Sequence, residues 1–217
     1  MDRDQFIGHV AGAAMNVALP RPPTVEDRLP ELPGENLLAL FRDRAQSVDA
    51  VVHGPVSRHG VPRAVTGIAA GHHSRTFMAW DDLPAPGVAS ALVAADVARV
   101  DHEVLAGNRL EHQMGYSGVD LGVTGADAGL AESGSIVLAH GANRPRMASL
   151  VPEVHVALLD VALMERTLAH WAHRRPGAAA GTANLVVITG PSRTADIEQQ
   201  LNLGVHGPKH VHIVMIK

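Results

Sequence analysis

The stretch LGVTGADAGLAESGSIVLA, residues 121–139, contains the pattern that decides the fold. An apolar segment ends at Thr124 and Gly125, as a strand that enters a turn does. Thr124 and Asp127 have the spacing of a capping box, which predicts a short helix over residues 126–133. Gly134 is placed as the left-handed residue that ends this helix. A second strand then follows at residues 135–139.

The same alternation of strands and helices continues on both sides of this stretch. On its C-terminal side the pattern predicts strands at 118–124, 135–139, 153–159, 185–189 and 210–216, and helices at 126–133, 161–174 and 193–203. On its N-terminal side it predicts helices at 35–48 and 61–71, and strands at 49–54 and 76–81. Such alternation is typical of an α/β fold with a layered, mostly parallel sheet covered on both faces.

The N-terminal region has a different composition. One predicted helical face over residues 2–17 carries Phe6, Ile7 and further apolar residues, and five prolines follow within residues 19–34. Proline fixes φ and cannot donate a backbone hydrogen bond, so this second segment is an extended linker. We therefore expect a helical arm and Pro-rich linker at 1–33 and one α/β domain at 34–217.

Composition excludes several classes of function. The 217 residues include no cysteine, which rules out disulfides, thiolate-held iron–sulfur clusters and a cysteine nucleophile in this chain. A net charge of −4 and only 3% aromatic residues argue against nucleic acid as the main partner. We find no signal peptide and no apolar run long enough for a membrane span. The 14 histidines are scattered and are interpreted as a composition bias.

Glu132 is the candidate catalytic residue. In the predicted helix it occupies the last turn, where an acid costs about 0.3–1 kcal/mol against the helix dipole. One interpretation is a solvated surface glutamate. The other is an acid held near a strand end, where open α/β sheets bind ligands. On the second interpretation, the substrate-binding candidates around it are Thr124, Gly125, Asp127 and Gly134.

A second candidate site follows the apolar strand LVVIT. Gly190 turns the chain, and Ser192, Arg193 and Thr194 lie at the entrance of the predicted helix 193–203. Free amides, hydroxyls and a guanidinium together form a plausible anion-binding site, to which we add His206. The alternative is ordinary helix capping by the two hydroxyls.

A metal site is not expected. His210 and His212 share a strand face, and histidines recur in GHHSRT at 71–76, but no Asp, Glu or Cys nearby completes a ligand set.

The segments VTGADAGLAESGSIVL and ITGPSRTADIEQQLNLGVHGP, in this order and about 50 residues apart, resemble the LUD-domain family and its LutC-like lactate-utilisation members. The resemblance is strong over residues 118–217. It implies a fold like that of ribose-phosphate isomerase, glucosamine-phosphate deaminase and the CoA transferases. Glu132-Ser133-Gly134 also resembles the setting of the CoA-transferase nucleophile, although the glycine-rich oxyanion segment of those enzymes has no counterpart here.

The resemblance further implies a cytoplasmic subunit that helps to oxidise L-lactate to pyruvate. The chain itself would carry no cofactor, and its partners would be LutA-like and LutB-like iron–sulfur proteins and a small carboxylate. Two alternatives stay open: a stand-alone transferase or isomerase acting on an anionic acyl or sugar-phosphate substrate, and a non-catalytic ligand-binding protein.

Overall fold

The computed structural model describes residues 2–15, 36–101, 118–195, 201–203 and 207–217. The chain divides into two compact units, Met1–Glu31 and Leu32–Lys217. In the first unit the described element is helix α1 (Arg3–Met15). Phe6 and Ile7 of this helix are both about half exposed. The boundary expected at residues 33 and 34 lies outside the described residues.

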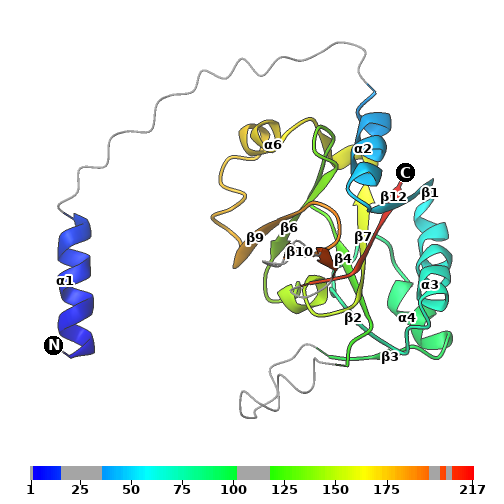
Figure 1. Cartoon of the computed structure of the whole chain (residues 1–217), viewed down its shortest axis with the longest axis horizontal. Helices are drawn as coiled ribbons and strands as arrows, with labels where there is room; N and C mark the ends of the chain where they lie inside the picture. The colour runs from blue at the N-terminus through cyan, green and yellow to red at the C-terminus, as the bar shows by residue number, and fades with distance from the viewer. Residues whose placement is uncertain (1, 16–35, 102–117, 196–200, 204–206) are drawn as a thin grey trace. The chain divides into compact units, whose positions relative to one another are not determined.

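The second unit is built on a six-stranded sheet in which every neighbouring pair of strands is parallel (Figure 1). The strand order is β1-β12-β7-β4-β2-β3. These strands are β1 (Val51–Val56), β2 (Thr76–Ala79), β3 (Ala98–Arg99), β4 (Leu121–Gly125), β7 (Val154–Asp160) and β12 (His210–Ile216). The α/β class with a mostly parallel sheet is therefore confirmed.

A second sheet of four strands has the order β8-β5-β6-β9 and is mostly antiparallel. Its strands are β5 (Ala128–Leu130), β6 (Ser135–His140), β8 (Met164–Glu165) and β9 (Asn184–Ile188). A separate antiparallel pair joins β10 (Arg193–Ala195) to β11 (Leu201–Leu203). The helices of this unit are α2 (Leu37–Ser47), α3 (Val61–Gly71), α4 (Val88–Ala94) and α6 (Leu168–Arg174), with short 3-10 turns η1 (Arg58–Gly60), η2 (Arg146–Ser149) and η3 (Val161–Leu163).

Two apolar cores cover the two faces of the parallel sheet. On one face, α3 and α4 contribute Val65 and Leu92 to a core with alternate strand residues such as Leu121 and Val156. On the other face, α2 contributes Phe41, and the second sheet lies on the same side (Figure 1). Strands covered on both faces explain the nearly continuous apolar character of VHVALL and VHIVMI.

Three predicted helices are wrong, at least in part. Residues 128–130, inside the predicted helix 126–133, form β5 and pair with β6 as a hairpin. The predicted helix 161–174 is a 3-10 turn and strand β8 before the short helix α6. The predicted helix 193–203 is strand at both of its described ends, β10 and β11. In each case strand pairing prevails over the local helix signal: β5 and β10 each pair with the next strand along the chain, and β8 pairs with the earlier strand β5.

Candidate functional site at the carboxyl edge of the parallel sheet

The topology indicates where the fold is best suited to bind a ligand. From β2 the chain crosses through α4 to β3 on one side, whereas from β4 it proceeds to β7 on the other side. Neighbouring β2 and β4 therefore flank the point where the strand order reverses. Open α/β sheets bind ligands outside the carboxyl ends of strands at this point. Here those ends are followed by Trp80, Asp81 and Asp82 after β2, and by Ala126 and Asp127 after β4.

Arg144 links the two strand ends. Its Nε lies 2.7 Å from the Asp82 carboxylate, and a terminal guanidinium nitrogen lies 2.9 Å from the Asp127 carboxylate. The guanidinium carbon also stands 5.0 Å from the centre of the Trp80 ring. Although burial opposes the charge, the hydrogen bonds that Arg144 donates to the Asp82 and Asp127 carboxylates raise the pKa of Arg144 above its usual value. Arg144 therefore stays cationic and holds three side chains in fixed positions.

Asp127 is held from a second direction. Its other carboxylate oxygen accepts a hydrogen bond of 2.7 Å from the backbone N–H of Ala139 in β6. Because Ala139 and Arg144 together use both oxygens, this carboxylate has one orientation. The predicted capping role of Asp127 is wrong, since no helix follows it; Asp127 instead ties the parallel sheet to the second sheet.

A layer of buried polar groups lies beneath this edge. The Trp80 indole N–H donates to the carbonyl of Pro145, and the ring meets His140 edge-on with 5.6 Å between ring centres. His140 is only 3% exposed, and burial lowers its pKa, so the ring is neutral near pH 7. Gly125 belongs to this layer because a Cβ there would lie 3.3 Å from Pro84 and 3.6 Å from the Trp80 ring.

Thr124 is part of the core rather than a surface cap. Its hydroxyl lies 2.9 Å from Nε2 of His155, and both residues are fully buried. Burial lowers the pKa of His155 to about 3, with smaller contributions from His140 and His212. Among the described residues, Nδ1 of His155 has no hydrogen-bond partner. The neutral pair therefore lies in the core below the edge.

The other guanidiniums of this edge are also paired with carboxylates. Arg58, after β1, forms an ion pair with Asp160 at the end of β7. Arg99 at the end of β3 lies 2.7 Å from Asp81. With Arg144, each arginine named here already has an acidic partner, so an anionic ligand would have to displace a carboxylate to reach one.

Glu132 lies in a turn between β5 and β6, so the helix-dipole argument for it is wrong. Its side chain is 57% exposed, and its nearest ionic partner is Arg166 at 4.0 Å. Its backbone N–H donates to the Arg166 carbonyl at 3.0 Å. The interpretation as a solvated acid and the interpretation as a functional acid both remain compatible with this position.

Gly134 and Gly190 adopt the positive φ that their turns require, +67° and +69°. A Cβ on Gly134 would lie under 3.0 Å from the backbone nitrogen of Ala45 in α2, and one on Gly190 equally close to the carbonyl of Val48. Both glycines therefore let a turn pack against the end of α2. Between them, the Ser135 hydroxyl lies 2.7 Å from the Thr189 hydroxyl, which links the two turns.

The predicted anion-binding residues lie in or beside a strand, not at a helix entrance. The Ser192 N–H donates to the Pro208 carbonyl at 2.9 Å, and Arg193 forms an ion pair with Asp49. The backbone of Thr194 pairs with that of Asn202 in the β10–β11 ladder. His206 lies outside the described residues. The predicted anion site depended on free backbone amides at the start of a helix. In the described residues of this segment there is no such helix start.

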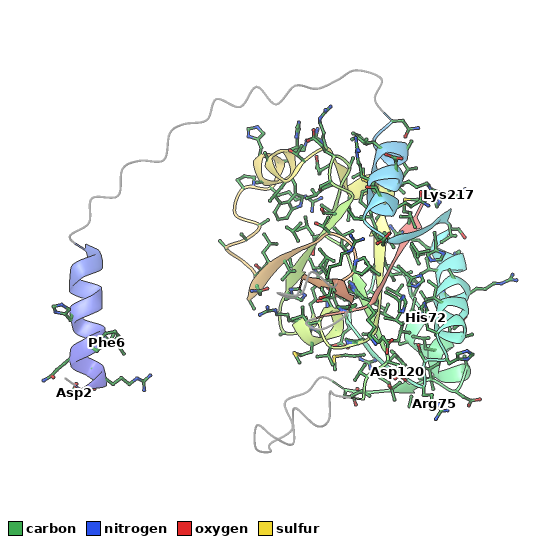
Figure 2. The ribbon with its side chains drawn as sticks, viewed as in Figure 1. Asp2, Phe6, His72, Arg75, Asp120 and Lys217 are labelled. Atoms are coloured by element: carbon green, nitrogen blue, oxygen red, sulfur yellow. The ribbon has the colours of Figure 1, made fainter. Side chains whose placement is uncertain are left out.

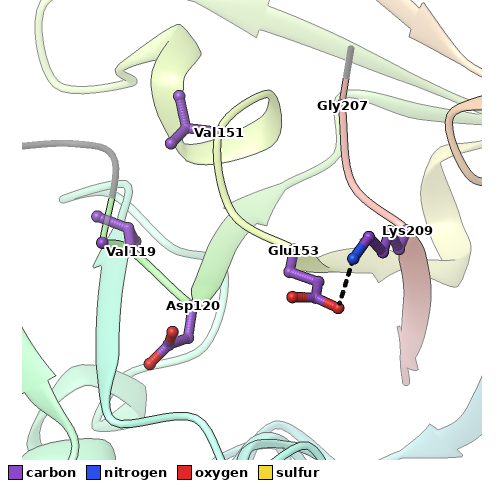
Figure 3. A pocket seen from close by; sticks show the side chains of 7 residues that line it. Val119, Asp120, Val151, Glu153, Gly207 and Lys209 are labelled. Carbon is purple, nitrogen blue, oxygen red and sulfur yellow. Dashed lines mark hydrogen bonds and ion pairs between the residues drawn. The ribbon is translucent and has the colours of Figure 1, made fainter. Parts of the chain in front are cut away.

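Among the described residues, two hollows away from the carboxyl edge are considered as ligand sites. One, of about 260 Å³, lies at the amino ends of β4, β7 and β12, where Glu153 pairs with Lys209 at 3.2 Å (Figure 3). Asp120, which is labelled next to Arg75 in Figure 2, already accepts hydrogen bonds on its carboxylate from the N–H groups of Arg75 and Thr76. The other, of about 350 Å³, lies between α3 and a group of histidines. Within the described ranges, no group of three or more His, Asp or Glu side chains is arranged to hold a metal ion.

Comparison with known proteins agrees with this architecture. The family model of the LUD domain matches residues 38–216, which is most of the chain. This chain belongs to the LUD domain family. The Deinococcus radiodurans DUF162 family protein, a solved structure, has the same fold: its TM-score is 0.64, with 24% identity over 83% of this chain and 96% of that one.

Several sequence relatives of this LUD domain chain are named lactate utilization protein C. The one from Halalkalibacterium halodurans is 30% identical over 175 residues, 76% of this chain and 74% of that protein. The one from Exiguobacterium is 38% identical over 101 residues, and an uncharacterised protein of Neisseria meningitidis is 35% identical over 102. Each of these last two alignments spans 44% of the relative's length. In the described part of the chain, no helix is long and apolar enough to cross a membrane.

Proposed function

We propose that this LUD domain protein is a cytoplasmic subunit of a complex that oxidises L-lactate to pyruvate. Its place in the family and the names of its relatives support a role in lactate utilisation. Oxidation of the lactate hydroxyl to a ketone removes two electrons and two protons. We assign the electrons to LutA-like and LutB-like iron–sulfur partners.

The observation that carries this division of labour is the absence of cysteine from all 217 residues. Iron–sulfur clusters are held mainly by cysteine thiolates, so clusters that accept these electrons must lie on other chains. The proposed subunit has no redox cofactor of its own. Its contribution is to bind and position the substrate or the partner proteins. It also exchanges protons with them.

The carboxyl edge supports such a contribution. Arg144 fixes Asp82 and Asp127 in one geometry, and the surrounding arginines are already neutralised by acids. A rigid surface of paired charges is suited to meet complementary charges on a partner, where charge pairs set register and partner choice. We place the contact with the iron–sulfur proteins here, and we assign to exposed Glu132 a further ionic contact with a cationic partner group.

Reconstitution tests this proposal. The purified chain alone is expected to show no absorbance in the visible region and no oxidation of L-lactate. Addition of the two cluster-bearing partners should restore electron transfer from lactate to an artificial acceptor, and leaving out this chain should abolish it. Sustained lactate turnover by the isolated chain, or full activity of the partners without it, would disprove the proposal.

Complementation provides the same test in cells. A strain that lacks this gene should fail to grow on L-lactate as sole carbon source but grow normally on pyruvate. The wild-type gene should restore growth on lactate. Normal growth of the deletion strain on lactate would contradict the assigned role.

A further inference from the structure

Three histidines from three elements form a hydrogen-bonded row on the α3 face of the parallel sheet. Nε2 of His53 in β1 lies 2.9 Å from Nδ1 of His212 in β12. The other ring nitrogen of His212, Nε2, lies 2.9 Å from Nε2 of His72, which follows the last residue of α3 (Figure 2). The His53 and His212 rings are 17° from parallel with their centres 5.2 Å apart, as expected for two rings joined edge to edge.

Counting protons shows how the row behaves. Each N–H···N bond needs one proton, so the two bonds hold two protons among four nitrogens. A neutral His212 carries one of them, and it therefore donates to one neighbour and accepts from the other. When His212 takes up a proton it becomes an imidazolium, supplies both of these protons and donates to both neighbours; the neighbour that had donated through Nε2 then carries its own proton on Nδ1. The row can therefore take up one extra proton while both of its N–H···N hydrogen bonds are kept.

The described groups around the row do not offset that extra charge. Burial lowers the pKa of His212 to about 4, and His53, His72 and His210 add to the effect. Burial likewise lowers the pKa of His53 and His72.

Nearby charges act in both directions. Arg42 of α2 opposes protonation of His53, and His210 and His73 oppose protonation of His72. Glu153 favours it, but this acid is already paired with Lys209. The protonated row therefore lacks a negative charge nearby, and a bound anion would supply it.

A cavity of about 350 Å³ lies where such an anion would fit. It is lined by His53, Ala64, Gly67, Ile68, Gly71, His72 and His212. The glycines of α3 create the space, since a Cβ on Gly67 or Gly71 would meet nothing within 4 Å. Ligand sites typically occupy about 300–1,000 Å³, so this cavity is at the small end of the range and has room for a small carboxylate.

We propose that this cavity binds a small monocarboxylate together with one proton, which is shared by the His53–His212–His72 row. The carboxylate supplies the negative charge that the row lacks, and the proton supplies donors for the carboxylate. Each therefore strengthens binding of the other by the same factor. The choice of L-lactate as the probe rests on the proposed function, whereas acetate tests the site without it.

Calorimetry on the purified full-length chain tests the coupling. L-lactate and acetate are titrated at pH 6 and pH 7, each in two buffers of different ionisation enthalpy. We expect uptake of about one proton per bound carboxylate and an affinity about tenfold tighter at pH 6 than at pH 7. Lactamide, which has the same shape without the charge, should not bind. Binding without proton uptake, or equal binding of lactamide, would overturn the proposal.

Two variants test the location of the site. Gly67→Leu fills the cavity without touching a histidine and should abolish binding while the melting temperature stays close to that of the wild type. Ala70→Leu, on an exposed position of the same helix, is its matched control and should bind normally. His212→Gln should remove the proton uptake, and His59→Gln, an exposed histidine outside the cavity lining, should keep it.

The proposal is overturned if Gly67→Leu and Ala70→Leu bind carboxylate with equal affinity, or if His212→Gln takes up as many protons as the wild type. Tight Zn²⁺ binding without carboxylate binding would also overturn it, because the histidines would then form a metal site. Failure of this site is distinguishable from failure of the proposed function. Calorimetry with acetate on the purified chain tests the carboxylate site, and growth of the deletion strain on lactate tests the proposed function.

Discussion

Two acids of the same short stretch, Asp127 and Glu132, occupy very different environments. The Asp127 side chain is 22% exposed, and both of its oxygens are bound, by Arg144 and by the Ala139 amide. The Glu132 side chain is 57% exposed, with Arg166 at 4.0 Å. Five residues of sequence thus separate an acid that joins two sheets from an acid that faces solvent. Only the exposed one is free to change without a structural cost.

The turn that carries Glu132 is nevertheless held firmly by the next glycine. Gly134→Ala is expected to cause the largest loss of stability, about 2–4 kcal/mol, because the new Cβ would overlap the α2 backbone and alanine disfavours positive φ. Denaturant titration should show a lower midpoint. Gly141→Ala, where a Cβ would meet nothing within 4 Å, is the control and should unfold like the wild type. Equal midpoints for the two variants would show that α2 does not pack against this turn.

Acidification should also destabilise the protein through the region beneath Asp127, with a smaller effect for each pH unit. His155 has a folded-state pKa of about 3 and an ordinary value of 6.5 when unfolded. Between these values the unfolded chain binds a proton that the folded chain does not. The free energy of unfolding therefore falls as pH decreases below 6.5, by about 1.4 kcal/mol per pH unit for this one group. Above 6.5 the histidine is neutral in both states and contributes no pH dependence.

Comparison of variants isolates this group. His155→Gln should reduce the slope of unfolding free energy against pH between pH 6 and pH 4, whatever its effect on stability at neutral pH. His59→Gln, an exposed histidine, should leave the slope unchanged. Parallel curves for wild type and His155→Gln would mean that His155 is protonated in the folded protein.

Asp127→Asn should have a modest effect on stability, about 1 kcal/mol, because a partly exposed ion pair to Arg144 is lost while the amide can still accept from Ala139. Its effect on function should be larger, with poor complementation of growth on L-lactate. Asp101→Asn, whose side chain is 78% exposed, should complement fully. Wild-type growth with Asp127→Asn would exclude the carboxyl edge from the function.

Glu132→Gln should have the smallest effect on folding, with a melting temperature equal to that of the wild type, since an exposed pair at 4.0 Å contributes little. We predict impaired growth on L-lactate all the same, through loss of an ionic contact to a partner. A thermal melt of Glu132→Gln measures its stability, and a growth assay with the same variant on L-lactate measures its function. Full growth would leave Glu132 as an ordinary solvated acid.

The sequence predicted the strands better than the helices. The strands around Val123, Val137, Val156 and Ile213 are all present, because residues buried on both faces leave an unmistakable apolar run. The helix at 126–133 is absent because β6 pairs with residues 128–130, and no local pattern reveals that hairpin. The glycines at 134 and 190 were recognised as turns, but their close packing on α2 depends on a helix more than 80 residues earlier.

The sites were harder to predict because they join distant parts of the chain. Arg144 and Asp82 are 62 residues apart, and His53 and His212 are 159 apart. Nothing in the spacing of these residues brings them together. The alternation of His210 and His212 along one strand face is visible in the sequence. The hydrogen bond of His212 to His53 required the parallel register of β1 with β12, and its hydrogen bond to His72 required the end of α3 to lie against β12.

That register also has a consequence for synthesis of the protein. Within the described residues β1 is an edge strand whose sheet neighbour is β12, and β12 also lies against β7 in full register. At translation rates of about 5–20 residues per second, β1 leaves the ribosome on the order of 10–30 seconds before its partner exists. From the time it is made β1 lacks its sheet neighbour, and β7, which is made later, has one open hydrogen-bonding edge until β12 follows. We expect the nascent chain to depend on ribosome-associated chaperones until β12 is inserted between them.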